Sequence, residues 1–212
     1  MSGSITRTKK ITYSAMFAAI ATVLMYFEVP LPFMPPFLKM DLSGLVSILA
    51  AFMFGPLSAI LITLVKDIIH IFTSTSGGVG QVADFFMVSA FSIAASMAYR
   101  RFHTRKGAIL GLSLGTLAMA VVGCFTNKYM LIPFYAQLMP IEDILSACSA
   151  VNPLIGSLDT YILFGAFPFN LIKGAILSVI TLLLYKRLSN FIKENTIFDK
   201  KPAAVDKAPK MG

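Results

Sequence analysis

The hydrophobic pattern of the chain consists of six apolar stretches, separated by short segments rich in proline, glycine, serine or charge. A helix needs about 20 mainly apolar residues to cross a bilayer, and most of the stretches approach or reach that length. They cover residues 11–27, 42–54, 57–72, 82–99, 108–131 and 160–185. The pattern therefore predicts an all-α fold, an integral membrane six-helix bundle whose second helix is short.

The segments between these stretches predict where the helices end. A Gly-Pro pair at 55–56 separates the second and third helices, since proline is well tolerated at the first position of a helix. Residues 73–80 are rich in serine and glycine and indicate a loop. Residues 133–159 mix prolines with acids, and we expect an extracellular excursion that contains a short helix. We expect residues 1–192 to form one membrane domain and residues 193–212 a charged, flexible cytoplasmic tail.

Composition and charge sharpen this picture. Hydrophobic residues make up 57% of the chain and charged residues 13%, and the mean hydropathy is +0.78, whereas a soluble domain carries about 25% charged residues. The net charge of +8 comes largely from three basic clusters beside apolar stretches, so we attribute it to the positive-inside rule and expect no nucleic-acid binding. Six spans place all three clusters on one side, which predicts a multi-pass cell-membrane protein with both termini cytoplasmic. The clusters are Arg7, Lys9 and Lys10; Arg100, Arg101, Arg105 and Lys106; and Lys186, Arg187 and Lys193.

A lysine inside the last apolar stretch is the first sign of function. Lys173 follows Asn170 by three residues, so both lie on one face of the helix. A charged residue at the centre of a membrane helix costs about 2.5–3.5 kcal/mol on insertion scales, and such residues usually bind a ligand, an ion or a partner charge. Lys173 therefore either faces a ligand or forms an internal ion pair with Asp67 or Asp84.

Other polar residues gather in the outer halves of the spans. Lys66, Asp67 and His70 favour structural pairing. Gln81 and Asp84 open the fourth span, where they either line a site or complement a helix N-terminus. Asn127, near the outer end of the fifth span, either joins that site or forms an interhelical hydrogen bond. Because the inner halves carry no matching polar line, we predict a polar pocket open to the outside and not a pore. The candidates are Lys66, Asp67, His70, Gln81, Asp84, Thr126, Asn127, Lys128, Asn170 and Lys173.

Motifs for catalysis or metal binding are not found in the sequence. It has no Walker A motif, no zinc-ligand spacing and no nucleophile elbow, so we expect no enzyme, no cofactor and no metal. Cys124 and Cys148 are expected to be free packing residues. Without an ATPase domain, transport would use an ion gradient or partner proteins. Ala15 and Ala19 form a small-x-x-x-small pattern, which allows close helix contact either within the bundle or with a partner.

Several motifs, in this order and spacing, resemble the substrate-binding S components of energy-coupling factor (ECF) vitamin transporters. The resemblance covers about residues 10–188 and is strongest to the riboflavin-specific members. One departure is Gln81, where many members of the family carry glutamate. The motifs are FLKMDLS at 37–43, FGP at 54–56 followed by Lys66, GQVADF at 80–85, TNKY at 126–129 and FNLIKG at 169–174.

The resemblance implies a function, partners and a set of site residues. The chain would be a substrate-binding domain that holds riboflavin as its transported ligand in an outward-facing pocket. It would deliver the ligand through a transmembrane T component and two ABC-type ATPases, with Ala15 and Ala19 docking on the T component. The alternatives are an S component for another small vitamin or for flavin mononucleotide, or an autonomous ion-coupled solute carrier. The implied ligand-binding residues are Leu38, Lys39, Met40, Gln81, Asp84, Asn127, Asn170 and Lys173.

Overall fold

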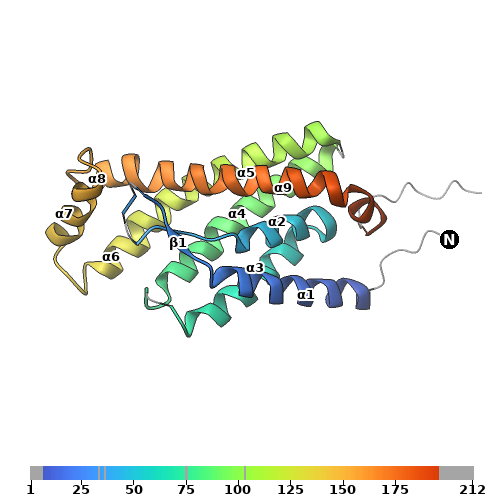
Figure 1. The fold of residues 1–212 in the computed structure, drawn as a ribbon, viewed down its shortest axis with the longest axis horizontal. Helices are drawn as coiled ribbons and strands as arrows, with labels where there is room; N and C mark the ends of the chain where they lie inside the picture. The colour runs from blue at the N-terminus through green and yellow to red at the C-terminus, as the bar shows by residue number, and fades with distance from the viewer. Residues whose placement is uncertain (1–6, 33, 36, 75, 103, 196–212) are drawn as a thin grey trace, which may run out of the picture.

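The computed structural model describes residues 7–32, 34–35, 37–74, 76–102 and 104–195, which form an elongated helical bundle (Figure 1). The first half of the chain contributes α1 (Arg7–Met25), α2 (Ser43–Phe54), α3 (Pro56–Ile71) and α4 (Val79–Phe102). The second half contributes α5 (Arg105–Thr126), α6 (Ile132–Tyr135), α7 (Ile141–Val151), α8 (Leu158–Tyr161) and α9 (Phe167–Asn195).

Two long helices of the second half contain a π-helical segment. α5 continues through η1 (Asn127–Leu131) into α6, and α8 continues through η2 (Ile162–Ala166) into α9. Within the described residues, α4 and the continuous helices Arg105–Tyr135 and Leu158–Tyr185 are long and apolar enough to cross a membrane. The protein is therefore a mostly helical membrane protein.

The helices occupy all six predicted stretches, with differences at their ends. α1 begins four residues earlier than the predicted 11, within the basic N-terminal segment. α4 begins at Val79, so the loop predicted for 73–80 is shorter; its turn contains Gly77 and Gly78, whose φ angles of 60° and 90° favour glycine. The fifth helix runs past its predicted end at 131, and α7 is the short helix expected within 133–159.

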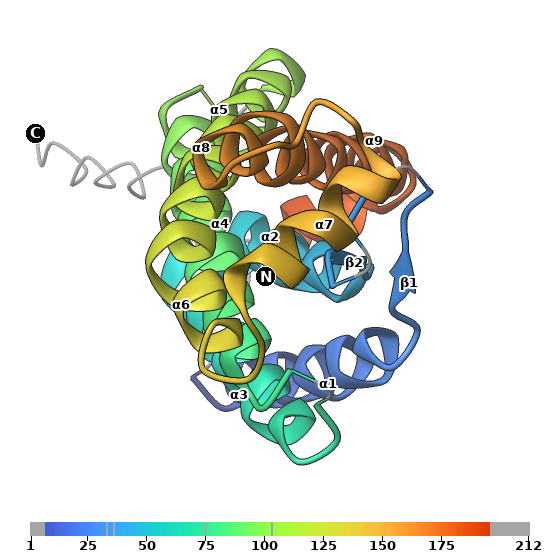
Figure 2. The same cartoon turned by 90° about the vertical axis from the view of Figure 1, so that its left-hand side faces the viewer.

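One end of the bundle carries a small β-ribbon and a covering helix. β1 (Val29–Pro30) pairs antiparallel with β2 (Lys39–Met40). The all-α prediction missed this ribbon, because strands of two residues leave no alternating pattern in the sequence. α7 lies across the same end of the molecule (Figure 2), where its buried Ile144 and Cys148 pack in one apolar cluster with Leu38.

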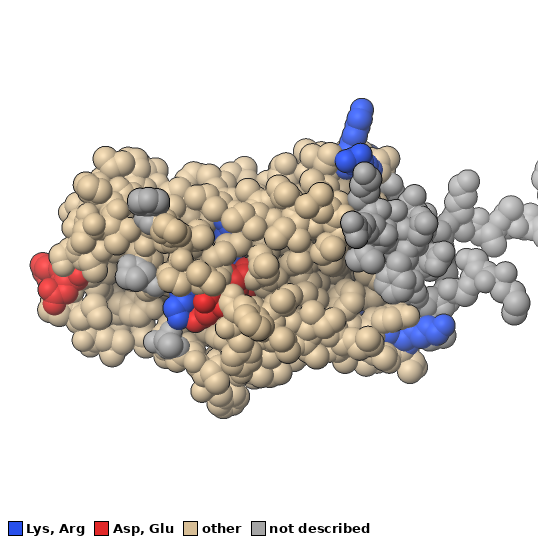
Figure 3. All heavy atoms as spheres, viewed as in Figure 1, with Lys and Arg blue, Asp and Glu red and all other residues tan. Residues whose placement is uncertain are grey.

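Charge is unevenly distributed over the surface. On the face drawn in Figure 3, most Lys and Arg side chains lie at the end where α1 begins, and Asp and Glu side chains lie at the α7 end and in a small group between the two ends. The start of α1 and the α4–α5 connection share one end of the bundle (Figure 1). The first predicted basic cluster lies at the start of α1, and the second lies on both sides of the α4–α5 connection.

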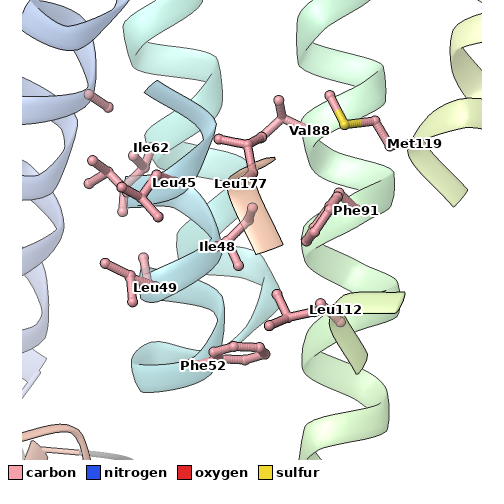
Figure 4. Close-up of a cluster of buried hydrophobic side chains, with 14 of the residues drawn as sticks. Leu45, Ile48, Leu49, Phe52, Ile62, Val88, Phe91, Leu112, Met119 and Leu177 are labelled. Atoms are coloured by element: carbon pink, nitrogen blue, oxygen red, sulfur yellow. The ribbon is translucent and has the colours of Figure 1, made fainter. Parts of the chain in front are cut away.

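The core is centred on α2, which is buried along its whole length. Complete burial explains why this helix is apolar on every face. Its Ile48 and Phe52 belong to a cluster with Phe91 of α4, Leu112 of α5 and Leu177 of α9 (Figure 4). This apolar cluster forms a packed base for the polar residues described below.

Glycines allow α5 to approach α4 closely. A Cβ atom added to Gly111 would lie 2.5 Å from the carbonyl oxygen of Ala95, and one added to Gly115 would lie 2.9 Å from the ring of Phe91. Small residues at such crossings are typical of membrane helices, because backbone contact replaces the hydrophobic drive that lipid removes.

We expect Gly111→Ala to destabilise the bundle by about 1–3 kcal/mol, because the new methyl group would meet backbone that cannot move without separating α4 from α5. The midpoint of thermal unfolding in detergent should fall accordingly. Gly156→Ala is the matched control, since a Cβ atom there has no neighbour within 4 Å. Equal midpoints for the two variants would contradict the close contact.

Candidate functional site

A cavity of about 380 Å³ lies between the end of α1, the β2 segment, the start of α4, η1 and α9. Seven of the eight ligand-binding residues predicted from the sequence line it. Met40 is the exception: it is buried but does not line the cavity. The seven are Leu38, Lys39, Gln81, Asp84, Asn127, Asn170 and Lys173.

Asp84 holds two buried lysines from neighbouring helices. One carboxylate oxygen lies 2.6 Å from the Lys66 Nζ atom of α3, and the other lies 2.8 Å from the Lys173 Nζ atom of α9. Lys66 also pairs with Asp67 at 2.7 Å, and Lys173 pairs with Asp41 at 2.7 Å. Ion pairs of this kind compensate the high cost of taking each charge out of water.

Lys173 therefore combines the two roles that the sequence left as alternatives. It pairs with Asp84, as one alternative stated, and it also lines the cavity. Asp67 is not its partner but that of Lys66, and the second partner of Lys173 is Asp41. An ammonium group has three N–H donors. Two of them are used by Asp41 and Asp84, which leaves one without an acceptor among the described residues.

Asp41 connects the cavity-lining loop to this ion-pair group and was missed as a site residue. It lies beside the β2 segment, where its carboxylate accepts hydrogen bonds from the backbone N–H and the hydroxyl of Ser43, the first residue of α2. Burial on its own would raise the pKa of the Asp41 carboxyl, but the charges of Lys173 and Lys66 and the hydrogen bond from Lys173 together hold that pKa below its usual range. Asp41 was present in a quoted motif, FLKMDLS at 37–43, but no role was predicted for it.

The two site asparagines are held in the same way. Asn127 Nδ2 donates to the Gly123 carbonyl at 2.8 Å, and Asn170 Nδ2 donates to the Ala166 carbonyl at 2.9 Å, in each case four residues back along the helix. The Asn127 Oδ1 atom accepts a hydrogen bond from the Tyr161 hydroxyl at 2.5 Å. The Asn170 Oδ1 atom is buried with no partner among the described residues. It is a hydrogen-bond acceptor suited to a donor on a ligand.

Each asparagine is linked to a π-helical segment: Asn127 is the first residue of η1, and Asn170 donates to Ala166, the last residue of η2. Each of these segments ends two residues before a proline. η1 ends at Leu131 before Pro133, and η2 ends at Ala166 before Pro168. Proline lacks an N–H and clashes with the carbonyl four residues earlier, which favours local widening of the helix. The Phe164 carbonyl, which Pro168 cannot bond, accepts instead from the Asn152 side chain at 3.3 Å. Pro133 and Pro168 are the features of the sequence from which these π-helical segments could have been predicted.

A second polar group fixes Gln81 at the start of α4. Its Nε2 atom lies 3.0 Å from His70 Nδ1, and its Oε1 atom accepts from the Ser74 hydroxyl at 2.7 Å. His70 also contacts the Tyr26 ring edge-on. His70 is thus a satisfied buried histidine that orients Gln81, in line with the structural interpretation preferred for it from the sequence.

The rim and walls of the cavity include further residues that were not among the eight predicted ligand-binding residues. Glu28 pairs with Lys39 across the β-ribbon, with 2.5 Å between Glu28 Oε1 and Lys39 Nζ. The walls are mainly apolar, so the cavity combines flat hydrophobic surfaces with a few directed polar groups, as small-molecule sites do. The additional lining residues are Met25, Glu28, Phe37, Asp41, Ser76, Gly80, Ala83, Met87, Leu131, Tyr135 and Phe169.

The small-residue pattern on α1 faces outward. Ala15 and Ala19 are exposed, whereas Ala18 and Ala21 are buried against the bundle. Ala18 and Ala21 therefore pack within the bundle, whereas Ala15 and Ala19 do not. Ala15 and Ala19 belong to the surface available to lipid or to a partner helix.

Fold and site together define a membrane-embedded helical protein with a buried polar cavity for a small organic molecule. A family model described as the substrate-specific component of ECF transporters matches residues 9–185. The chain belongs to this family, which consists of transporter components and not of enzymes. It is a multi-pass membrane protein.

Similar proteins agree with the family. The chain is 34% identical over 187 residues to the riboflavin transporter RibU of Staphylococcus aureus, a match that covers 88% of this chain and 94% of that protein. It is 29% identical to the riboflavin transporter FmnP of Bacillus subtilis, covering 89% and 96% of the two chains. A solved structure of the S component of a bacterial ECF transporter matches with a TM-score of 0.71 and 32% identity, over 89% of this chain and 99% of the other.

We expect Lys66→Met to destabilise the protein by about 3–5 kcal/mol, because it leaves Asp67 without its cation and Asp84 with one cation instead of two. Unfolding in detergent would measure the loss. Lys128→Met is the matched control, since Lys128 is an exposed lysine whose partner Asp159 is also exposed, and should change little. Adding Asp67→Asn to Lys66→Met should recover part of the stability; no recovery would contradict the role of charge balance.

Proposed function

We propose that this protein is the riboflavin-binding subunit of an ATP-driven ECF uptake transporter. The observation that carries the proposal is the cavity, in which apolar walls from Leu38, Met87 and Phe169 meet the amide of Asn170 and the ammonium of Lys173. Relatives that align with most of the chain are named riboflavin transporters. The volume of the cavity, about 380 Å³, falls in the usual range of small-molecule sites, about 300–1,000 Å³.

The chemistry of the site suits an isoalloxazine ring. The ring is flat and apolar on its faces, so the apolar walls bury it, while its polar edge carries both donors and acceptors. Asn170 Oδ1, which has no partner among the described residues, accepts from a ring N–H. The remaining N–H of Lys173 donates to a ring carbonyl or a ribityl oxygen. Gln81 and Asn127 contact the ring edge or the ribityl chain, and Lys39, Met40 and Asp84 support the site around them.

Charge favours riboflavin over flavin mononucleotide. The described lining contains the carboxylates of Glu28, Asp41 and Asp84 against the ammonium groups of Lys39 and Lys173, and both lysines are already paired. A phosphate group would enter an environment with more negative than positive charge and would be repelled. The proposal therefore takes a neutral vitamin as the ligand, transported and not held as a cofactor.

Delivery of the ligand requires partners. We infer that the chain works with a transmembrane T component and two ABC-type ATPases, as its family implies, and not as an autonomous ion-coupled carrier. Ala15 and Ala19 are the proposed docking residues, because they form an exposed small-residue surface on α1. Small side chains let a partner helix approach to backbone contact within the bilayer.

The proposed topology has six spans with both termini cytoplasmic. It is supported by the shared end of α1 and the α4–α5 connection, which brings two basic clusters together. With 12 residues, α2 is about 18 Å long and crosses only part of the hydrocarbon layer. The proposal keeps residues 1–192 as the substrate-binding domain and 193–212 as a cytoplasmic tail, of which residues 196–212 lie outside the described part of the chain.

The test of riboflavin binding is direct. We expect the protein, purified in mild detergent, to bind added riboflavin with quenching of flavin fluorescence, and to prefer it to flavin mononucleotide. Lys173→Gln should weaken binding by about 10- to 100-fold, because it removes a charged hydrogen-bond donor. The same substitution at Lys128, an exposed lysine that does not line the cavity, should leave affinity unchanged. Absence of riboflavin binding by the unmodified protein would refute the proposal.

A separate measurement tests docking. We expect Ala15→Leu combined with Ala19→Leu to abolish riboflavin uptake by cells that contain the partner proteins, while the purified variant still binds riboflavin normally. The added bulk obstructs a partner helix but touches nothing in the cavity. Ala175→Leu, at an exposed position of α9, is the matched control and should transport normally. Normal uptake by the α1 double variant would exclude docking at these alanines.

A further inference from the structure

Gly123 of α5 lies between the two asparagines of the cavity. Its carbonyl oxygen accepts the side-chain N–H of Asn127 at 2.8 Å, one helical turn ahead. The side-chain amide of Asn170, from α9, lies where a side chain of residue 123 would project. A Cβ atom added to Gly123 would lie 2.4 Å from Asn170 Nδ2 and 2.6 Å from Asn170 Cγ.

This contact differs in kind from those of Gly111 and Gly115, the two α5 glycines that approach α4. Gly111 faces backbone of α4, and Gly115 faces the ring of Phe91 together with the backbone of the same residue. Gly123 alone among these three faces a side-chain amide. A methyl group at Gly111 would press two helices apart, whereas a methyl group at Gly123 would press on the end of a short side chain. The consequence at Gly123 is therefore local to the cavity.

The Asn170 side chain has little freedom to yield. It is fully buried, and its Nδ2 atom is bound to the Ala166 carbonyl at 2.9 Å. This bond determines which way the amide is turned, and it leaves the buried Oδ1 atom as an unpaired acceptor. A side chain displaced by a new methyl group would lose the bond to Ala166 and move its Oδ1 atom.

We propose that Gly123 is a positioning residue for the ligand site: the absence of its side chain sets the place and orientation of the Asn170 amide, and its carbonyl holds Asn127. Gly123 itself provides no side chain to the ligand. The inference rests on the proposed riboflavin function, because the Asn170 acceptor is the group that is being positioned.

A double-mutant cycle in riboflavin binding tests this inference. Gly123→Ala and Asn170→Ala should each weaken binding by about tenfold or more, the loss expected when one directed hydrogen bond is removed. The combination should bind no more weakly than Asn170→Ala alone, because the atoms that the new methyl group meets are then absent. A merely structural effect of Gly123→Ala would persist in the Asn170→Ala background.

Gly111→Ala is the control for such a structural effect, because its new methyl group meets the Ala95 backbone and not Asn170. The change in riboflavin affinity that Gly111→Ala causes should be the same whether residue 170 is asparagine or alanine. Should Gly123→Ala fold poorly, the unfolding midpoint becomes the readout, and Asn170→Ala should restore it towards that of Asn170→Ala alone. The inference is wrong if Gly123→Ala binds riboflavin normally, if the two losses multiply, or if the midpoint is not restored. Failure of the unmodified protein to bind riboflavin would instead refute the proposed function, and the inference with it.

Discussion

The ion pairs of Asp84 are the interaction on which the rest of this structure depends. One carboxylate joins a lysine of α3 to a lysine of α9, and the second lysine extends the connection to Asp41 ahead of α2. All of these groups are buried, so the attraction between them acts in a medium that screens charge poorly. Removing one member leaves another charge buried without compensation. The ion pairs therefore hold together α3, α4, α9 and the segment ahead of α2.

The apolar core and the polar site depend on each other. α2, buried on every side, forms a base of packed side chains below the cavity. The charged group above it could not be held in place by a loosely packed bundle, because short ion pairs require side chains with fixed positions. In return, the ion pairs fasten the helices around the cavity, while away from it the helices are joined by apolar contacts, small-residue crossings and a few hydroxyl hydrogen bonds such as Tyr99–Tyr185.

Much of this could be predicted from the sequence, and the remainder has identifiable physical causes. Apolar stretches of helical length indicated every long helix, and Lys173 and Asn170 drew attention to the cavity because polar residues are costly there. Asp41 was missed since its partner lies 132 residues away in the chain, and pairings at such separation leave no local pattern. The π-helical segments were not predicted: Pro133 was assigned to the excursion after the fifth span, Pro168 lies within the sixth, and no helix irregularity was inferred from either proline. Met40 was included through its neighbours in a motif, and alternation along the β2 strand turns it away from the cavity wall.

One hydrogen bond described above links the covering segment to the site mechanically. The Phe164 carbonyl is available because Pro168 cannot bond to it, and Asn152, in the connection that follows α7, takes its place. Residue 164 lies less than two helical turns before Asn170 on the same continuous helix. This hydrogen bond therefore couples the connection after α7 to the continuous helix that carries Asn170, so the segment that covers one end of the bundle and one wall of the cavity share a backbone.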